Sequence, residues 1–286
     1  IIVQSEKKDP SFCKEFLNNR AKIIFLPIKP LPLSLFKFYF FLKRENINSI
    51  CDFRGDFSGL TLMISYLANV KNRIVFYRES VHQFQSSFFK NQYIKILNSL
   101  TLYFSTKILS NSVQALKYFF NSDSLKNKYH KIIRNGVYDE NELVPINDYR
   151  KIYGIPKDAF VIGHIGRYTY AKNHKLILDI AKSLCKKDSK YYFLLCGEGV
   201  KNNILPFLNF HNLNKNVITP GLCNNIPSQL CVMDLFLFPS HNEGQPNALI
   251  EAMNAGIPIL ASKIPSIEET VPKEMKSVLL PLDSSN

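Results

Sequence analysis

The chain has 286 residues, a hydrophobic content of 46% and a formal net charge of +13. This length allows one large or two medium domains, and the hydrophobic content is high enough for buried cores, which excludes global disorder. The basic excess lies mainly in residues 1–148, where 21 Lys and Arg stand against 12 Asp and Glu. It favours a phosphorylated ligand or an anionic membrane surface, whereas the lack of an Arg-rich run, an aromatic nucleic-acid box or a zinc finger excludes nucleic acid as a partner.

In the first half, short apolar runs predict strands at 1–4, 22–26, 47–53, 73–77, 107–110 and 131–134. Helical patterns lie between them, at 11–19, 33–46, 60–68, 88–104 and 112–120. The run 33–46 is aromatic, with Lys37, Lys43 and Arg44 interleaved, and it is too short and too charged to span a bilayer. It is either a domain helix with one buried face or a basic aromatic patch that rests on a membrane surface.

Residues 138–158 are polar and contain two prolines, so we place a domain boundary there, with domains at 1–148 and 149–286. Beyond it, strands are predicted at 160–166, 191–196, 217–219, 235–238, 257–261 and 277–282, and helices at 174–186, 226–232 and from Asn247 onward. Strands and helices that alternate at these lengths predict an α/β fold with parallel sheets covered on both faces.

Six cysteines occur without a CxxC pair, and we interpret them as reduced core thiols of a cytosolic protein without a metal or disulfide role: Cys13, Cys51, Cys185, Cys196, Cys223 and Cys231. No signal peptide and no apolar run of membrane-spanning length is apparent. The chain begins with Ile, so we expect its natural start to be missing or processed.

The stretch 240–256, SHNEGQPNALIEAMNAG, has the clearest chemical content. Glu243 and Gly244 lie in a loop after the strand 235–238, and Pro246 suits the first turn of the helix that follows. Glu251 falls on the expected exposed stripe of that helix. The backbone N–H groups of Gln245 and Asn247, with the helix dipole behind them, would face an anion while the carboxylates accept hydroxyl hydrogen bonds.

Other candidate residues also follow predicted strands. Arg167 and Lys172 come after the strand 160–166 and suit a diphosphate, and a turn at 197–199, Gly-Glu-Gly, follows the next strand. Because the carboxyl ends of parallel strands share one crevice, these groups are expected to meet. Arg78, Glu79 and His82, after the strand 73–77, are cleft candidates. His164 within a strand is interpreted as a core or cleft-lining histidine. No dinucleotide fingerprint, Walker A sequence, nucleophile elbow or metal-ligand spacing is present.

Four motifs together indicate a family: EGQPNALIEA, in which seven residues separate Glu243 from Glu251, GR-x4-K at 166–172, LLCGEG at 194–199 and NG at 135–136. With these motifs the chain resembles the retaining GT-B glycosyltransferases of family 4, in particular the bacterial capsule and exopolysaccharide enzymes. The resemblance covers most of the chain and is dense from about residue 130. It implies two Rossmann-like doubly wound domains that face a cleft, with the acceptor side in 1–148 and the nucleotide-sugar side in 149–286. It further implies transfer of a sugar from a nucleotide-diphosphate sugar to a hydroxyl of a glycan or lipid-linked acceptor, in surface polysaccharide synthesis.

The resemblance also assigns roles to residues. Arg167 and Lys172 would stabilise the departing diphosphate and, with Glu243, would be catalytic. Glu243 would contact donor-sugar hydroxyls and Glu251 the ribose. The other donor-binding positions would be Gly166, Gly197, Glu198, Gly221, Gly244, Gln245, Pro246 and Asn247, with Arg78 and His82 on the acceptor side. No metal or other cofactor is implied, and we expect a UDP-sugar rather than a GDP-sugar.

The sequence departs from the family at both ends, because the first strand with its Gly-rich loop and the closing helices are missing. It also lacks the histidine that related enzymes often carry after the strand at 73–77. An epimerase-like nucleotide-sugar enzyme of the same fold, or an inactive nucleotide-sugar-binding remnant, therefore stays open as an alternative. The expected location is the cytoplasm, with peripheral contact at the inner face of an anionic membrane.

Overall fold

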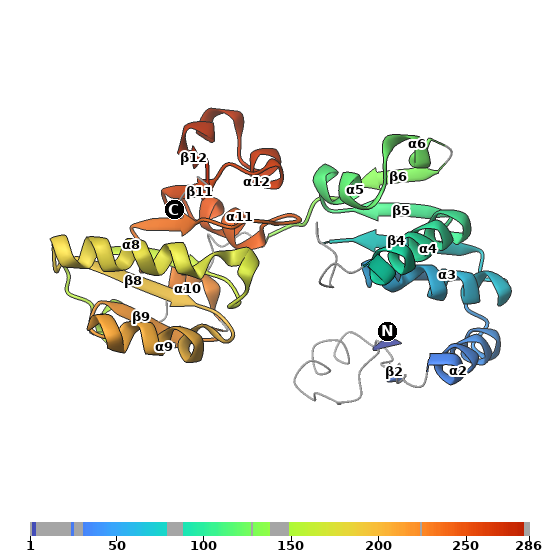
Figure 1. Ribbon diagram of the computed structural model, residues 1–286, viewed down its shortest axis with the longest axis horizontal. Coiled ribbons are helices and arrows are strands. Elements are labelled where there is room, and N and C mark those ends of the chain that lie inside the picture. The colour runs from blue at the N-terminus through green and yellow to red at the C-terminus, as the bar shows by residue number, and fades with distance from the viewer. Residues whose placement is uncertain are drawn as a thin grey trace. The chain divides into compact units, whose positions relative to one another are not determined.

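The structure, a computed structural model, describes residues 2–3, 24–25, 31–78, 88–126, 128–137, 149–223 and 225–282. The chain forms two compact units (Figure 1). The first contains Ile1–Arg78, His82–Ser110 and Leu116–Ile132, and the second contains Glu79–Val81, Asn111–Ala115 and Ile133–Asn286. The helix predicted at 11–19 lies outside the described residues.

The first unit contains a four-stranded parallel sheet in the order β3-β4-β5-β6. Its strands are β3 (Ser49–Asp52), β4 (Asn72–Tyr77), β5 (Lys107–Ser110) and β6 (Tyr129–Ile132). The described helices around it are α2 (Leu31–Arg44), α3 (Ser58–Leu67), α4 (Phe88–Phe104), α5 (Val113–Phe119) and α6 (Ser122–Leu125). Two further short strands, β1 (Ile2–Val3) and β2 (Ile24–Phe25), pair with each other. The side chains of Val75, Tyr77 and Ile108 are buried between this sheet and its helices, which explains why apolar or aromatic residues stand at these strand positions.

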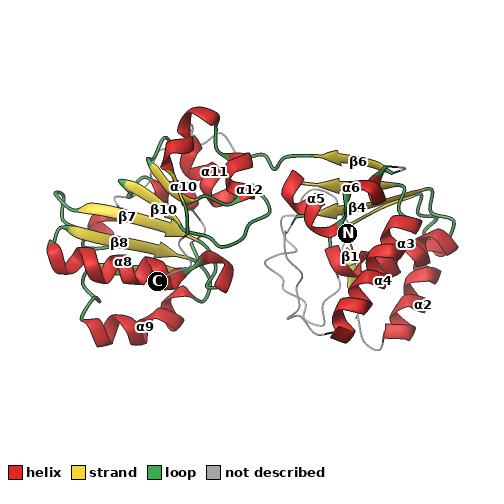
Figure 2. Cartoon of the chain, turned by 45° about the horizontal axis from the view of Figure 1, so that its top comes forward, coloured by secondary structure: helices red, strands yellow, loops and turns green. Residues whose placement is uncertain are grey.

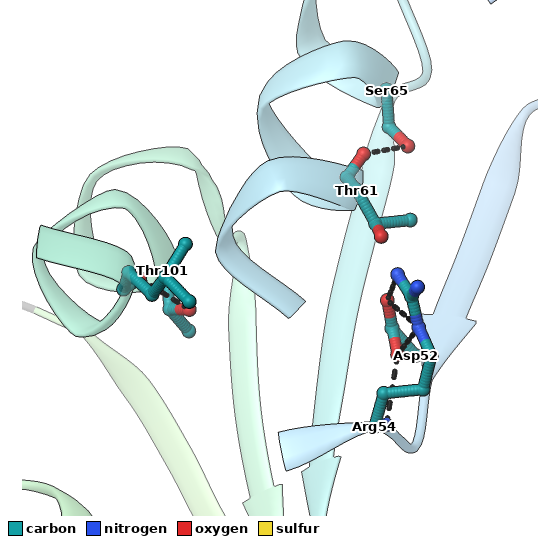
Figure 3. A network of polar contacts seen from close by, with 6 residues as sticks. Asp52, Arg54, Thr61, Ser65 and Thr101 are labelled. Atoms are coloured by element: carbon teal, nitrogen blue, oxygen red, sulfur yellow. Dashed lines mark hydrogen bonds and ion pairs between the residues drawn. The ribbon is translucent and has the colours of Figure 1, made fainter. Parts of the chain in front are cut away.

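A local polar network organises the turn after β3 (Figure 3). The buried carboxylate of Asp52 accepts hydrogen bonds from the Arg54 backbone N–H at 2.9 Å and from its Nη2 at 2.7 Å. Nearby, the buried Ser65 hydroxyl on α3 donates to the Thr61 carbonyl at 2.7 Å, so it is satisfied within its own helix. The RGD triplet at 54–56 is therefore part of a structural turn that leads into a short 3-10 helix, η1 (Gly55–Phe57).

The second unit contains a six-stranded parallel sheet in the order β12-β11-β10-β7-β8-β9 (Figure 2). Its strands are β7 (Phe160–Ile165), β8 (Tyr191–Cys196), β9 (Val217–Gly221), β10 (Leu235–Phe238), β11 (Ile259–Ser262) and β12 (Leu279–Leu280). The chain builds β8 and β9 on one side of β7 and then returns to place β10 on its other side. The strand order thus reverses between β7 and β10.

Helices cover both faces of this sheet. On one face, α8 (His174–Lys187) and α9 (Val200–His211) pack against Phe193 and Leu195 of β8. The core on the opposite face of the sheet includes Leu194 of β8 and contains residues of four helices: α7 (Tyr149–Ile152), α10 (Ile226–Leu230), α11 (Asn247–Asn254) and α12 (Pro265–Thr270). Successive β8 residues alternate between two apolar cores, as a strand buried on both faces requires.

The predicted α/β class with parallel sheets flanked by helices is confirmed. The strand predicted at 277–282 is wrong for most of its length, because η4 (Lys273–Val278) is a 3-10 helix and only Leu279 and Leu280 pair with β11. The core-thiol interpretation is wrong for Cys51 and Cys231, which are exposed. Within the part of the chain that the structure describes, no helix has the length and apolar character to cross a membrane.

Candidate active site

Four loops of the second unit follow strands of one parallel sheet. They begin at Gly166 after β7, at Gly197 after β8, at Leu222 after β9 and at Pro239 after β10. The carboxyl ends of parallel strands lie at the same edge of a sheet, and a crevice forms where the strand order reverses. The residues predicted to carry chemistry are concentrated in these loops.

An ion pair between Lys172 and Glu243 lies at the centre of this edge. Lys172 Nζ is 2.7 Å from Glu243 Oε1, and the two side chains are 20% and 11% exposed. Lys172 Nζ also lies 4.7 Å from the centroid of the Phe238 ring at the end of β10, which is a cation–π distance. The structure therefore brings together two of the predicted catalytic residues, from loops 71 residues apart in sequence.

Further contacts hold the loops after β7 and β10 together. The backbone N–H of His241 donates to the Ala171 carbonyl at 2.8 Å. The ring of Tyr170 stacks on that of His241, with centroids 4.9 Å apart and an interplanar angle of 19°. These two contacts hold the 3-10 turn Tyr170–Lys172 in place, so the backbone that carries the Lys172 side chain is fixed.

The start of α11 forms a second part of the site. Gly244 and Pro246 are buried, and helix geometry leaves the N–H groups of its first turn without acceptors inside the helix. The Asn135 backbone N–H donates to Gln245 Oε1 at 2.6 Å, and Asn135 Nδ2 donates to Asn247 Oδ1 at 2.7 Å. The sequence marked Asn135 only as part of a turn, and nothing in its local pattern indicated these partners.

Glu251 lies on α11 two turns after its start. It is half-buried rather than exposed as predicted, since the helix packs Leu249 and Ala252 into the core and draws the flanking positions toward it. Burial raises the pKa of the Glu251 carboxyl above its usual value. None of the described residues forms an ion pair with Glu251, so its carboxylate oxygens can accept hydrogen bonds from a ligand.

The loops after β7, β8 and β9 are joined by backbone hydrogen bonds. The Gly197 N–H donates to the Gly221 carbonyl at 2.8 Å, and the Tyr168 N–H donates to the Glu198 carbonyl at 2.9 Å. At Gly197, where φ is +147°, a Cβ atom would lie 2.0 Å from the Gly166 carbonyl oxygen. Gly166, Gly197, Glu198 and Gly221 therefore lie along one continuous edge.

Arg167 directly follows Gly166 in this edge. Its side chain is exposed, and among the described residues none makes an ion pair with it. The structure thus places Arg167 in the same loop as Lys172, although it does not bring the guanidinium against the Lys172–Glu243 pair.

Two buried histidines lie behind Lys172. His164 Nδ1 is 2.9 Å from the Leu237 carbonyl, to which it can donate, and the His164 and His174 rings are perpendicular with centroids 5.1 Å apart. Burial lowers the pKa of His164 to about 3 and that of His174 to about 4, helped for both by the nearby Lys172. Both rings are therefore neutral at neutral pH and add no charge beside the Lys172 ammonium. The prediction that His164 is a core histidine is confirmed by its burial.

The two acceptor-side candidates belong to a different part of the chain. Arg78 directly follows β4 in the first unit and is exposed, whereas His82 and the further cleft candidate Glu79 lie outside the described residues. No group of three or more His, Cys, Asp or Glu residues within the described ranges has the geometry of a metal site.

Comparison with known proteins finds a family match in the second unit. Residues 145–281, just under half of the chain, match the family model described as Glycosyl transferases group 1. The match contains the whole Lys172–Glu243 site. The predicted resemblance to glycosyltransferases of this type is confirmed for this domain.

Curated relatives extend the similarity toward the N-terminus. The capsular polysaccharide biosynthesis glycosyltransferase CapH of Staphylococcus aureus is 32% identical over 240 residues, which is 80% of this chain and 63% of CapH. The Escherichia coli enzyme named UDP-Gal:alpha-D-GlcNAc-diphosphoundecaprenol alpha-1,3-galactosyltransferase is 26% identical over 300 residues, 95% of this chain and 75% of that protein. The chain thus spans less than two thirds of CapH.

Solved structures show the same fold at lower sequence identity. Anabaena HepE in complex with UDP-glucose has a TM-score of 0.78 and 18% identity, over 99% of this chain and 85% of HepE. WaaG, a glycosyltransferase involved in lipopolysaccharide biosynthesis, has a TM-score of 0.64 and 16% identity, over 85% of this chain and 68% of WaaG. These similarities confirm the GT-B fold class.

Proposed function

We propose that the protein is a retaining glycosyltransferase that moves a sugar from a nucleotide-diphosphate sugar to a hydroxyl of a glycan or lipid-linked acceptor in surface polysaccharide synthesis. The observation that carries the proposal is the Lys172–Glu243 pair, 2.7 Å apart at the reversal of strand order and beside the first turn of α11. Residues 149–286 would bind the donor and residues 1–148 the acceptor, with Arg78 and His82 as acceptor-side candidates.

Each donor group has a chemically suitable partner. Arg167 and Lys172 would bind the diphosphate, since a guanidinium can form two parallel hydrogen bonds and an ammonium acts as a point charge. Glu243 would accept hydrogen bonds from donor-sugar hydroxyls, and Glu251 from the ribose hydroxyls. The Gly197-Glu198-Gly199 turn and the segment around Gly221 would border the base.

The same groups would lower the barrier to transfer. Departure of the nucleoside diphosphate builds negative charge on its leaving oxygen, and positive groups fixed before the reaction stabilise that charge without reorganisation. Arg167, Lys172 and the N-terminus of α11 would supply this positive potential. We therefore propose that transfer needs no divalent metal. Sugar would be delivered on the face from which the diphosphate leaves, through an oxocarbenium-like state.

Uridine is the base that we favour. Its support is the HepE complex with UDP-glucose and the name of the E. coli relative, which includes UDP-Gal as donor and GlcNAc-diphosphoundecaprenol as acceptor. A screen of nucleotide release from UDP- and GDP-sugars, with GlcNAc-diphosphoundecaprenol as probe acceptor, would identify the donor. Release of free epimerised sugar nucleotide without a transfer product would instead indicate an epimerase.

Glu251→Ala should weaken UDP binding at least tenfold, because the ribose hydroxyls lose a charged acceptor for which water is a poor substitute in a half-buried site. Isothermal calorimetry with UDP measures the change. Glu274→Ala, at an exposed position in η4, is the matched control and should bind like the wild type. Equal affinity of the Glu251→Ala variant would contradict the ribose role, and absence of heat with UDP, GDP and their sugars in the wild type would refute donor binding altogether.

We also propose that helix α2 of the first unit contacts an anionic membrane surface at the inner face of the membrane. The helix has two faces: Phe38 and Leu42 are buried against α3 and its flanking residues, whereas Phe36 and Phe40 are 62% and 52% exposed. Exposed basic side chains accompany the outer face, at Lys37, Lys43 and Arg44. Aromatic side chains flanked by Lys and Arg suit an interfacial helix, and a lipid-linked acceptor would be reached from there.

Phe36→Ser combined with Phe40→Ser should reduce co-sedimentation of the protein with phosphatidylglycerol vesicles severalfold, since the apolar contact is lost while the charges stay. Binding to phosphatidylcholine vesicles should be weak for both proteins. Tyr103→Ser, which removes a 75% exposed aromatic side chain from α4, serves as the control and should bind like the wild type. Undiminished sedimentation of the double variant would exclude α2 as the contact.

A further inference from the structure

Two cysteines lie at the ends of neighbouring strands. Cys196 is the last residue of β8, and the strand register pairs it with Gly221, the last residue of β9. The chain turns at Gly221, where φ is +86°, and Cys223 follows two residues later. Its Sγ atom lies 3.7 Å from the Gly221 carbonyl oxygen. The turn therefore directs Cys223 back toward the end of β8.

The two thiols lie close enough to interact electrostatically. Cys196 is part of the buried apolar core of the second unit, and the partly buried Cys223 packs against that core. Cys196 is buried and Cys223 is half-buried, so a small oxidant can reach Cys223 first. Tyr153 interacts electrostatically with both thiols; its hydroxyl donates to Gln229 Oε1 at 2.8 Å, and burial raises its pKa to about 12.

The roles of the two sulfurs differ. Their interaction lowers the pKa of Cys223 and, together with burial, raises that of Cys196. Because the thiolate is the nucleophile in thiol–disulfide exchange, Cys223 is the sulfur that attacks an oxidant and Cys196 the one that resolves the product.

We propose that Cys196 and Cys223 form a reversible disulfide that switches the donor-binding edge of the second unit. With a disulfide oxidant such as oxidised glutathione, the Cys223 thiolate attacks one sulfur and releases one glutathione thiolate. Cys196, after losing its proton to solvent, attacks Sγ of Cys223 and releases the second glutathione thiolate. The protein loses two hydrogen atoms and the oxidant is reduced to two thiols.

Formation of the Cys196–Cys223 disulfide would alter the edge of the sheet that carries the proposed donor site. A disulfide requires an S–S separation of about 2.05 Å, shorter than any sulfur hydrogen bond, so the segment after β9 must move toward β8. That segment carries Gly221, whose carbonyl accepts from the Gly197 N–H at 2.8 Å. Since both glycines border the base pocket of the proposed donor site, oxidation lowers donor affinity. This functional consequence rests on the proposed function, whereas formation of the bond does not.

The test uses the full chain, titrated with diamide or oxidised glutathione and then reduced with dithiothreitol. We expect the loss of two free thiols, a peptide that links Cys196 to Cys223 in non-reducing mass spectrometry, and an at least tenfold weaker UDP affinity that reduction restores. Cys223→Ser should abolish both the linked peptide and the change in affinity. Cys231→Ser, which removes an exposed cysteine, should respond like the wild type.

The outcomes separate the two proposals. A wild type that binds UDP when reduced and forms no Cys196–Cys223 peptide at saturating oxidant would overturn the disulfide. A linked peptide with unchanged UDP affinity would overturn the switch. A linked peptide in a protein that binds no nucleotide in either state would overturn the proposed function and the switch while the disulfide itself stands.

Discussion

Replacing Lys172 by methionine should lower kcat/KM for sugar transfer by about 10²- to 10³-fold, the range measured when one preorganised charge-stabilising group is removed from an active site. The ammonium is held 2.7 Å from Glu243 and 4.7 Å from the centroid of the Phe238 ring, so its positive charge is fixed before the reaction. Nucleotide release in the presence of donor and acceptor measures the effect. Lys175→Met, on the exposed first turn of α8, is the matched control and should keep full activity.

The loss of activity in Lys172→Met must be separated from a loss of stability. Removing the lysine leaves the Glu243 carboxylate, 11% exposed, without its partner, which destabilises the fold. The double variant Lys172→Met with Glu243→Gln removes both charges and should recover most of the unfolding free energy without recovering activity. If that double variant regained transfer, or if Lys172→Met alone transferred at the wild-type rate, the ammonium would have no role in the reaction.

Gly197→Ala should destabilise the protein by about 3 kcal/mol, the combined scale of backbone strain and overpacking. The added Cβ would lie 2.0 Å from the Gly166 carbonyl oxygen, and φ is +147°, a region that side chains rarely adopt. Relief requires the loops after β7 and β8 to separate, so UDP binding should be lost as well. Urea unfolding followed by circular dichroism measures the first effect and calorimetry the second.

Two other glycines serve as controls for this substitution. Gly154 has φ of +65° with open space around its Cβ position, so Gly154→Ala carries only the conformational cost, about 1 kcal/mol. Gly136 has open space and no positive φ, and Gly136→Ala should be nearly neutral. A Gly197→Ala variant no less stable than Gly154→Ala would show that the clash is relieved without separating the loops.

Local patterns predicted the regular elements of the second unit well. The apolar runs at 191–196 and 235–238 coincide with β8 and β10, and the period of 174–186 marks α8 to within one residue. These elements are long or fully buried, so local pattern and tertiary packing agree. Prediction failed at 277–282, where pairing is limited to two residues, and it missed α12, whose six residues are too few to show a period.

The site could be predicted residue by residue but not as a set of contacts. Glu243, Lys172 and Glu251 follow from motif and position. Their partners depend on strand order: β10 returns to β7, and this alone brings Glu243 to Lys172. The proximity of Cys196 and Cys223 cannot be predicted from the sequence for the same reason. The two residues lack CxxC spacing and approach each other only through the register of β8 with β9.

The reversal of strand order also sets when the site can form during synthesis. Strands β7, β8 and β9 are consecutive neighbours, so they can pair as they leave the ribosome. Glu243 emerges only after them, and β10 must then close a long loop back to β7 before its partner lysine is met. A nascent chain therefore presents Lys172 without Glu243 or Phe238 until β10 and its loop have been made, and premature termination before β10 would leave the candidate site without its carboxylates.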